Sequence, residues 1–210
     1  MEVRWILPGM PGAATREWFG RLPSGTDTRE DVYLLQPSLP GLSVKLRGGS
    51  SMDVKSFRGS PGILGLRGIG RGRLESWRKW SFRYDPPGWA GDPPAGWVAV
   101  RKWRRRIWFP LAASQREAPG PPQAASTGCM AELTEAEVRG DPWWSVGFEA
   151  TGSVVLLRSA LQHAADLLFA RPLPPGVQLS LDNSSSYAEW LGRQTLRSSE
   201  GWHLTCRGSG

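Results

Sequence analysis

In residues 72–82, "GRLESWRKWSF", charged and aromatic side chains alternate with other side chains in a pattern that few folds can accommodate. Successive side chains of an extended strand point to opposite faces, so one face would carry Arg73, Glu75, Trp77 and Lys79. A half-buried sheet normally has one apolar face and one polar face, each fairly uniform. Charges of both signs beside an aromatic ring instead indicate a strand whose inner face lines a polar interior. A closed barrel provides such an interior, because a wide barrel can enclose polar side chains.

Short alternating segments recur along most of the chain, and glycine and proline turns separate them. The pattern predicts about eight main strands, at residues 2–7, 31–35, 42–47, 52–55, 72–82, 98–109, 130–138 and 143–150. Eight strands in antiparallel order with few helices predict an α+β fold that is mainly antiparallel β. We expect a barrel or tunnel of about eight strands with a few peripheral helices.

Helical periodicity is clear in one segment, residues 153–170. Its apolar stripe consists of Val154, Leu157, Leu161, Ala164, Ala165 and Leu168. A shorter helix is predicted at residues 13–22, and residues 187–191 are expected to form a docking turn or helix. The remaining assignments are a glycine-rich loop at 59–72 and a short strand at 177–181.

The chain is predicted to form a single domain over residues 1–192. Residues 112–128 are rich in Ala, Pro, Gly and Gln, which is typical of a mobile linker. Periodicity fades after residue 192, so residues 193–210 are expected to be a loosely held tail.

The net charge of +7 and the pI of about 10.1 indicate an anionic partner, either nucleic acid or a phosphorylated small molecule. The basic residues are 22 Arg and 4 Lys, and all four lysines fall on predicted strands. A compact ammonium suits a point contact to phosphate. The alternative explanation is that the basic excess reflects solubility and coding bias.

Cys129 and Cys206 are far apart in sequence and lack the spacing of a zinc site or a disulfide framework. No apolar run reaches membrane-spanning length, and the first residues lack the pattern of a secretion signal. We therefore expect no membrane partner and a cytoplasmic location. The sequence leaves the oligomeric state open.

Several short motifs, taken in their order, resemble the CYTH superfamily, the triphosphate tunnel metalloenzymes. "SVKLR", "MDVK" and "GRLESW" are similar to three of its strands, and "ELTEAEVRGDPWWSVGFEATG" is similar to its late hairpin. The resemblance implies an eight-stranded tunnel that binds a triphosphate or polyphosphate and performs phosphoryl or nucleotidyl transfer with one or two magnesium or manganese ions. For this chain the expected reaction is metal-dependent hydrolysis of the bound phosphate, as in a triphosphatase.

Carried onto this sequence, the resemblance implies two sets of site residues and assigns no catalytic residue. The expected phosphate-binding set is Arg4, Lys45, Arg47, Lys55, Arg73, Lys79, Lys102 and Arg104. The expected metal-binding set is Glu2, Glu75, Glu132 and Glu149, because carboxylate oxygens are the ligands of hard divalent cations.

Two departures from the family pattern concern the metal. The first strand reads Glu-x-Glu-x-Lys in the family, whereas this chain has Glu2, Arg4 and Ile6. The late strand ends in paired carboxylates in the family, whereas here Glu149 is followed by Thr151. The arginine in place of a carboxylate favours direct binding of the anion.

Other interpretations of the same residues remain open. Lys45 and Arg47 fit a solvated hairpin face, and Glu75 fits a salt bridge to Arg73 or Lys79. In residues 101–106, "RKWRRR", either alternating set could face inward. The alternative function is a non-catalytic nucleic-acid-binding module with an Arg- and Trp-rich β-surface. A third possibility is an interaction domain whose tryptophans belong to the core.

Overall fold

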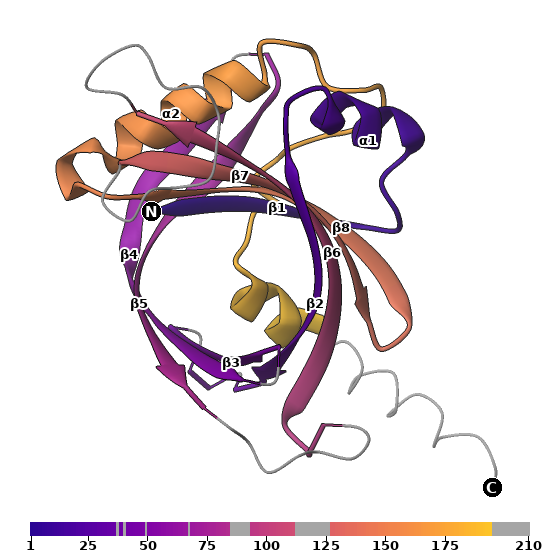
Figure 1. Cartoon of the computed structure of the whole chain (residues 1–210), viewed down its shortest axis with the longest axis vertical. Coiled ribbons are helices and arrows are strands. Elements are labelled where there is room, and N and C mark those ends of the chain that lie inside the picture. The colour runs from indigo at the N-terminus through magenta and orange to yellow at the C-terminus, as the bar shows by residue number, and fades with distance from the viewer. Residues whose placement is uncertain are drawn as a thin grey trace, which may run out of the picture.

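The computed structural model describes residues 1–36, 38–39, 41–48, 50–66, 68–84, 93–111 and 127–194. Antiparallel strands close into a barrel in the order β1-β5-β4-β3-β2-β6-β7-β8, and β8 pairs back onto β1 (Figure 1). The strands are β1 (Glu2–Pro8), β2 (Gly25–Leu34), β3 (Leu42–Arg47), β4 (Ser51–Leu66), β5 (Gly70–Arg83), β6 (Trp97–Pro110), β7 (Gly128–Val138) and β8 (Asp141–Thr151). The predicted fold class is confirmed.

Two helices cover part of the outer surface of the barrel, α1 (Ala13–Gly20) and α2 (Leu157–Leu168) (Figure 1). The outward residues Val3 and Trp5 of β1 are buried in the hydrophobic core to which these helices contribute. The stripe predicted for α2 is buried at Leu161, Ala164, Ala165 and Leu168. Val154 is 81% exposed, contrary to prediction, because the short 3-10 helix η1 (Val154–Leu156) precedes α2 and does not continue its stripe.

A second hydrophobic core fills one end of the barrel interior. A helical segment at residues 187–194 lies across this end (Figure 1), and its Trp190 and Leu191 are buried there. The strands contribute Ile6, Tyr33, Val98, Val100, Ala136 and Val138 to this core. The helical segment at residues 187–194, called the plug below, closes the barrel at this end. The interior that remains is a pocket.

The wall between β1 and β5 is completed by residues 183–185. Among the described residues, β1 and β5 pair only at Glu2 and Glu75. Beyond that point, the Ser185 amide donates to the Arg4 carbonyl oxygen at 3.0 Å. Residues 183–185 therefore lie beside β1 in the place that a neighbouring strand would otherwise occupy. The chain then continues directly into the helical segment at residues 187–194.

The strands differ from the prediction mainly in length. Strand β4 continues to Leu66 through the predicted loop at 59–72, with register shifts next to Gly59 and Gly62. Both glycines have positive φ, a conformation that allows a bulge without ending the strand. Strand β2 begins at Gly25 and not at residue 31. The predicted strand at 177–181 is wrong, because Leu179 makes only an isolated bridge, to Gly70.

Most of the predicted linker and tail, residues 112–126 and 195–210, lies outside the described residues. Gly128, predicted to end the linker, already belongs to β7, and residues 193–194 end the helical segment. In the described part of the chain, no helix is both long enough and apolar enough to cross a membrane.

Candidate functional site

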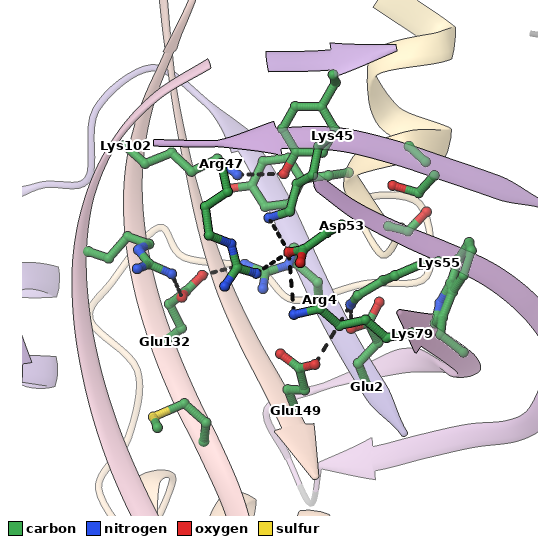
Figure 2. A pocket seen from close by; sticks show the side chains of 18 of the residues that line it. Glu2, Arg4, Lys45, Arg47, Asp53, Lys55, Lys79, Lys102, Glu132 and Glu149 are labelled. Atoms are coloured by element: carbon green, nitrogen blue, oxygen red, sulfur yellow. Dashed lines mark hydrogen bonds and ion pairs between the residues drawn. The ribbon is translucent and has the colours of Figure 1, made fainter. Parts of the chain in front are cut away.

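The polar part of the barrel interior contains a cavity of about 320 Å³ (Figure 2). Nine basic and four acidic side chains line it, which gives the lining a formal excess of positive charge. They are Arg4, Arg29, Lys45, Arg47, Lys55, Lys79, Lys102, Arg104 and Arg106, with Glu2, Asp53, Glu132 and Glu149. Every lysine of the chain belongs to this set, although arginine is more than five times as frequent as lysine in the sequence.

Asp31 on β2 holds three of the cations beneath the cavity surface. Its carboxylate is 3.0 Å from Lys45 Nζ, 2.9 Å from Lys102 Nζ and 3.1 Å from Arg29 Nε. Lys102 also donates to the Tyr33 hydroxyl at 2.6 Å. Burial alone would raise the pKa of Asp31, but Lys102, Lys45 and Arg29 overcome this effect and lower it. Asp31 is thus a fixed negative charge that keeps three cations in place.

Asp53 on β4 performs the same role close by, because Lys45 Nζ lies between it and Asp31. It accepts from Arg47, lies 3.3 Å from Lys79 Nζ and 3.8 Å from Lys45 Nζ, and accepts from the Ser81 hydroxyl at 2.7 Å. Burial opposes ionisation of Asp53, but these neighbours outweigh it and lower the pKa. One carboxylate again serves three cations.

Glu132 on β7 lies between two arginines of the pocket. Arg4 donates to it at 3.2 Å and Arg104 at 3.1 Å, and the Thr134 hydroxyl donates at 2.8 Å. Burial alone would raise the pKa of Glu132, but the two guanidinium groups and the Thr134 hydroxyl lower it to about 2. Arg104 is also paired with Asp27.

Burial also acts on the lysines themselves. It lowers the pKa of Lys45 to about 8, although Asp31 opposes the change. The pKa of Lys102, which is 2% exposed, is lowered well below its usual value for the same reason. An ammonium held away from water gains more from an added anion than a solvated one does.

Some hydrogen-bonding capacity of the pocket is left unused by the chain. Nε of Arg47 and Nε of Arg104 are buried, and neither has a hydrogen-bond acceptor among the described residues. A buried donor without an acceptor costs free energy, and the chain bears this cost at both arginines. The two guanidinium groups come from β3 and β6, the strands on either side of β2, so both line the same part of the barrel wall.

Around Glu2, Lys55 and Glu149 the carboxylates outnumber the cations, unlike around Asp31 and Asp53. Lys55 Nζ is 2.7 Å from Glu2 Oε2 and 3.7 Å from Glu149 Oε1, so one cation serves two carboxylates (Figure 2). Glu2 and Glu149 are directly opposite each other on β1 and β8. Lys55 is the main cause of the lowered pKa of Glu149. The two carboxylates in turn raise the pKa of Lys55 against the effect of burial.

Ten of the twelve residues predicted for the site line this cavity; Arg73 and Glu75 do not. Arg73 lies 3.4 Å from Glu189 of the plug segment. Glu75 is buried and accepts from Trp77 Nε1 at 2.8 Å, so its contact is neither of the salt bridges considered for it. Burial raises the pKa of Glu75. In residues 101–106, Lys102, Arg104 and Arg106 line the cavity.

Several residues of the pocket were not predicted. Arg29 lies outside the strand predicted at 31–35, because β2 begins at Gly25, and its alternation with Asp31 and Tyr33 is the available signal. Asp31 lies within the predicted strand and was not assigned to the site; it holds the cations from beneath the cavity surface. Asp53 alternates with Lys55 in "MDVK" and so could have been assigned to the same face. Tyr187 enters the pocket from the plug and has no such pattern, because the position of that segment depends on tertiary packing.

The expected metal ligands are each held by other groups of the chain. Glu132 is bound by Arg4 and Arg104, Glu75 by Trp77, and Lys55 lies between Glu2 and Glu149. Within the described ranges, no three His, Cys, Asp or Glu side chains are arranged to hold a metal ion. A divalent cation would need several carboxylate oxygens free to face it. The donor set as arranged therefore does not fit magnesium or manganese.

The chain matches no protein-family model and no curated protein sequence. Two solved structures from Pyrococcus horikoshii OT3 are similar to it. The PH1012 protein shares 16% identity at a TM-score of 0.44, over 90% of this chain and 98% of that one. The PH1819 protein shares 13% identity at a TM-score of 0.46, over 92% of this chain and 99% of that one. Neither name states a ligand, so a function for the pocket has to be argued from its own residues.

Proposed function

We propose that this protein binds a triphosphate or a longer polyphosphate inside its barrel, as a CYTH-like domain. The observation that carries the proposal is the convergence of all four lysines and five arginines on one cavity of about 320 Å³. Partly desolvated basic groups attract phosphate oxygens more strongly than the same groups spread over a wet surface. A solvated hairpin face does not account for Lys45 and Arg47, because both side chains line that cavity.

The shared carboxylates explain how the pocket remains stable without its ligand. Asp31, Asp53 and Glu132 each compensate several cations, which limits repulsion among like charges in a small volume. Because fewer carboxylates than cations are present, the cations keep attraction for a further anion. A polyphosphate can contact several of them at once, whereas monophosphate engages fewer.

The test is isothermal titration calorimetry with tripolyphosphate, monophosphate and sulfate at matched ionic strength. We expect saturable binding of tripolyphosphate and much weaker binding of the other two anions. Arg47→Gln should weaken tripolyphosphate binding about tenfold, because a charged hydrogen bond is lost. Arg101→Gln is the matched control, since Arg101 is a 63%-exposed side chain that pairs with Glu30 and Glu137. Equal binding of sulfate and tripolyphosphate would indicate generic screening and refute the proposal.

The nucleic-acid alternative is supported by a different surface. On β5, the Arg78 guanidinium lies 5.2 Å from the ring centroid of Trp80, and Trp80 and Phe82 are 40% and 53% exposed. Exposed aromatic rings next to arginine can stack on single-stranded bases. Filter binding of single-stranded DNA, lost in Trp80→Ala and not competed by tripolyphosphate, would favour this alternative. If neither ligand binds, an interaction domain becomes the better interpretation.

Hydrolysis assisted by magnesium or manganese stays a prediction from the resemblance. The carboxylates present do not fit the metal in the arrangement described above, so binding alone is the proposed function. Phosphate release from tripolyphosphate, measured with and without added magnesium and manganese, decides whether turnover occurs. The cytoplasmic location expected from the sequence also remains part of this proposal.

A further inference from the structure

The ammonium group of Lys55 lies where a bound cation would balance Glu2 and Glu149. Its Nζ is within 2.7 Å of one carboxylate and 3.7 Å of the other, and the Lys55 side chain is only 20% exposed (Figure 2). The two glutamates are in register on adjacent strands, so their side chains leave the barrel wall side by side. Like charges this close need a cation between them, and the chain supplies one itself.

Two other charged groups of the pocket, Glu132 and Arg4, are held in place and leave no further carboxylate for a metal at this point. Glu132 is bound by two arginines, and a metal that displaced Arg4 would separate this guanidinium from the carboxylate that balances it. Arg4 is built into the wall: a Cβ added at Gly147, its partner across the strands, would lie only 2.9 Å from Arg4 Cζ. The glycine thus makes room for the guanidinium, which points to a fixed position for Arg4.

We propose that Lys55, with Arg4 beside it, supplies the positive charge of this region, and that the pocket takes polyphosphate as the metal-free anion and not as its magnesium complex. This inference rests on the proposed function and specifies the form of its ligand. A magnesium complex brings its own cation, which would meet an ammonium already seated between the two glutamates. The free anion brings only negative charge, which suits the surplus of cations elsewhere in the pocket.

The first experiment compares tripolyphosphate binding in metal-free buffer and in buffer with excess magnesium, at matched ionic strength. We expect tight binding without metal, and weaker binding with magnesium because magnesium sequesters the free anion. Binding that requires magnesium, or that magnesium strengthens, would overturn the inference while leaving polyphosphate binding intact. No binding in either buffer would instead refute the proposed function.

The second experiment measures manganese binding without any phosphate, by the loss of the electron paramagnetic resonance signal of free Mn²⁺. The wild-type protein should leave the signal of free Mn²⁺ unchanged. A loss of that signal with the wild type would reveal a manganese site and overturn the inference, even if no variant folds. Lys55→Met should create a site, because Glu2 and Glu149 lose their cation. Lys55→Arg, which keeps the charge, should create none.

Lys79→Met is the matched control for the second experiment. It removes one ammonium from the same pocket, but Lys79 forms its ion pair with Asp53, and its charge acts on Glu149 less than that of Lys55 does. We expect no gain of manganese binding in this variant. Equal gains in Lys55→Met and Lys79→Met would show that only the overall charge of the pocket matters, and would also overturn the role given to Lys55. Circular dichroism establishes that each variant is folded.

Discussion

Lysine and arginine are distributed differently in this chain. All four lysines line the pocket, whereas arginines occur both in the pocket and on the outer surface, where Arg101 is an example. An ammonium is a compact point charge whose pKa responds to burial, while a guanidinium stays charged in all environments of the protein. The charge of the pocket can therefore change with pH through its lysines.

Binding of tripolyphosphate should weaken as the pH rises through about 8. Burial lowers the pKa of Lys45 to about 8, so this side chain becomes neutral above that pH and attracts phosphate less. Calorimetry at pH 7 and pH 9 measures the change. The Lys45→Met variant should bind tripolyphosphate more weakly at pH 7, and its affinity should change less between pH 7 and pH 9. An unchanged affinity of the wild type between the two pH values would contradict a pocket role for the Lys45 charge.

The free energy of unfolding should fall as the pH is lowered from about 4.5 to about 2. The pKa of Glu132 is 4.5 ordinarily and about 2 in the folded protein. A carboxyl whose pKa is lowered by folding stabilises the protein above its unfolded pKa, and this contribution disappears as the pH falls through the folded value. Glu132 alone contributes on the order of 3 kcal/mol by this argument.

Urea unfolding of the wild type and of Glu132→Gln across this pH range tests that contribution. The variant should be less stable at pH 7, because Arg4 and Arg104 lose their shared partner, and its stability should depend less on pH. Parallel pH profiles of the two proteins would show that Glu132 is not the titrating group.

At the scale of whole elements, the plug at residues 187–194 separates the two environments of the barrel interior. Trp190 packs edge-on against Trp143 with ring centroids 5.0 Å apart, and its neighbour Leu191 is 2% exposed. From the same segment, Tyr187 stacks on Tyr33 at 5.9 Å and reaches the polar pocket. The plug therefore both closes the barrel and forms the base of the pocket.

Leu191→Ala should destabilise the protein by about 2–5 kcal/mol, because it leaves a cavity in a closely packed core. Leu167→Ala on α2 is the control, since Leu167 is 48% exposed and should cost much less. Urea unfolding measures both differences. If the two substitutions cost the same, the plug is not packed into the barrel as described.

The sequence predicted the strands well and the plug poorly, for a physical reason. Alternation with a period of two is a local signal, so "SVKLR" groups Lys45 with Arg47 and "RKWRRRIWF" groups Lys102 with Arg104 on one face. The alternation alone does not tell which set of residues 101–106 faces inward. Burial of Trp190 depends on contacts with residues more than forty positions away, which no local pattern contains. The bulges at Gly59 and Gly62 were read as a loop because glycine is typical of both.

At the scale of the whole molecule, the barrel divides its side chains among three environments. An outer core lies beneath α1 and α2, an inner apolar core surrounds the plug, and the remaining interior is the charged pocket. The inward charge of Lys79 on β5 is thereby explained, because Asp53 on the neighbouring strand β4 holds it in place beside a space for an anion. The central claim is that this space receives a polyphosphate.

The most direct measurement is nuclear magnetic resonance of the protein labelled with carbon-13 at the lysine Cε positions. The chain has four lysines, and all of them line the pocket, so every lysine signal reports on it. Tripolyphosphate should shift all four signals in parallel until they saturate, and the affinity from these shifts should equal that from calorimetry. Single-stranded DNA bound at Trp80 should leave the four signals in place. Signals that stay in place, or that drift equally with sulfate at matched ionic strength, would contradict polyphosphate binding in the barrel.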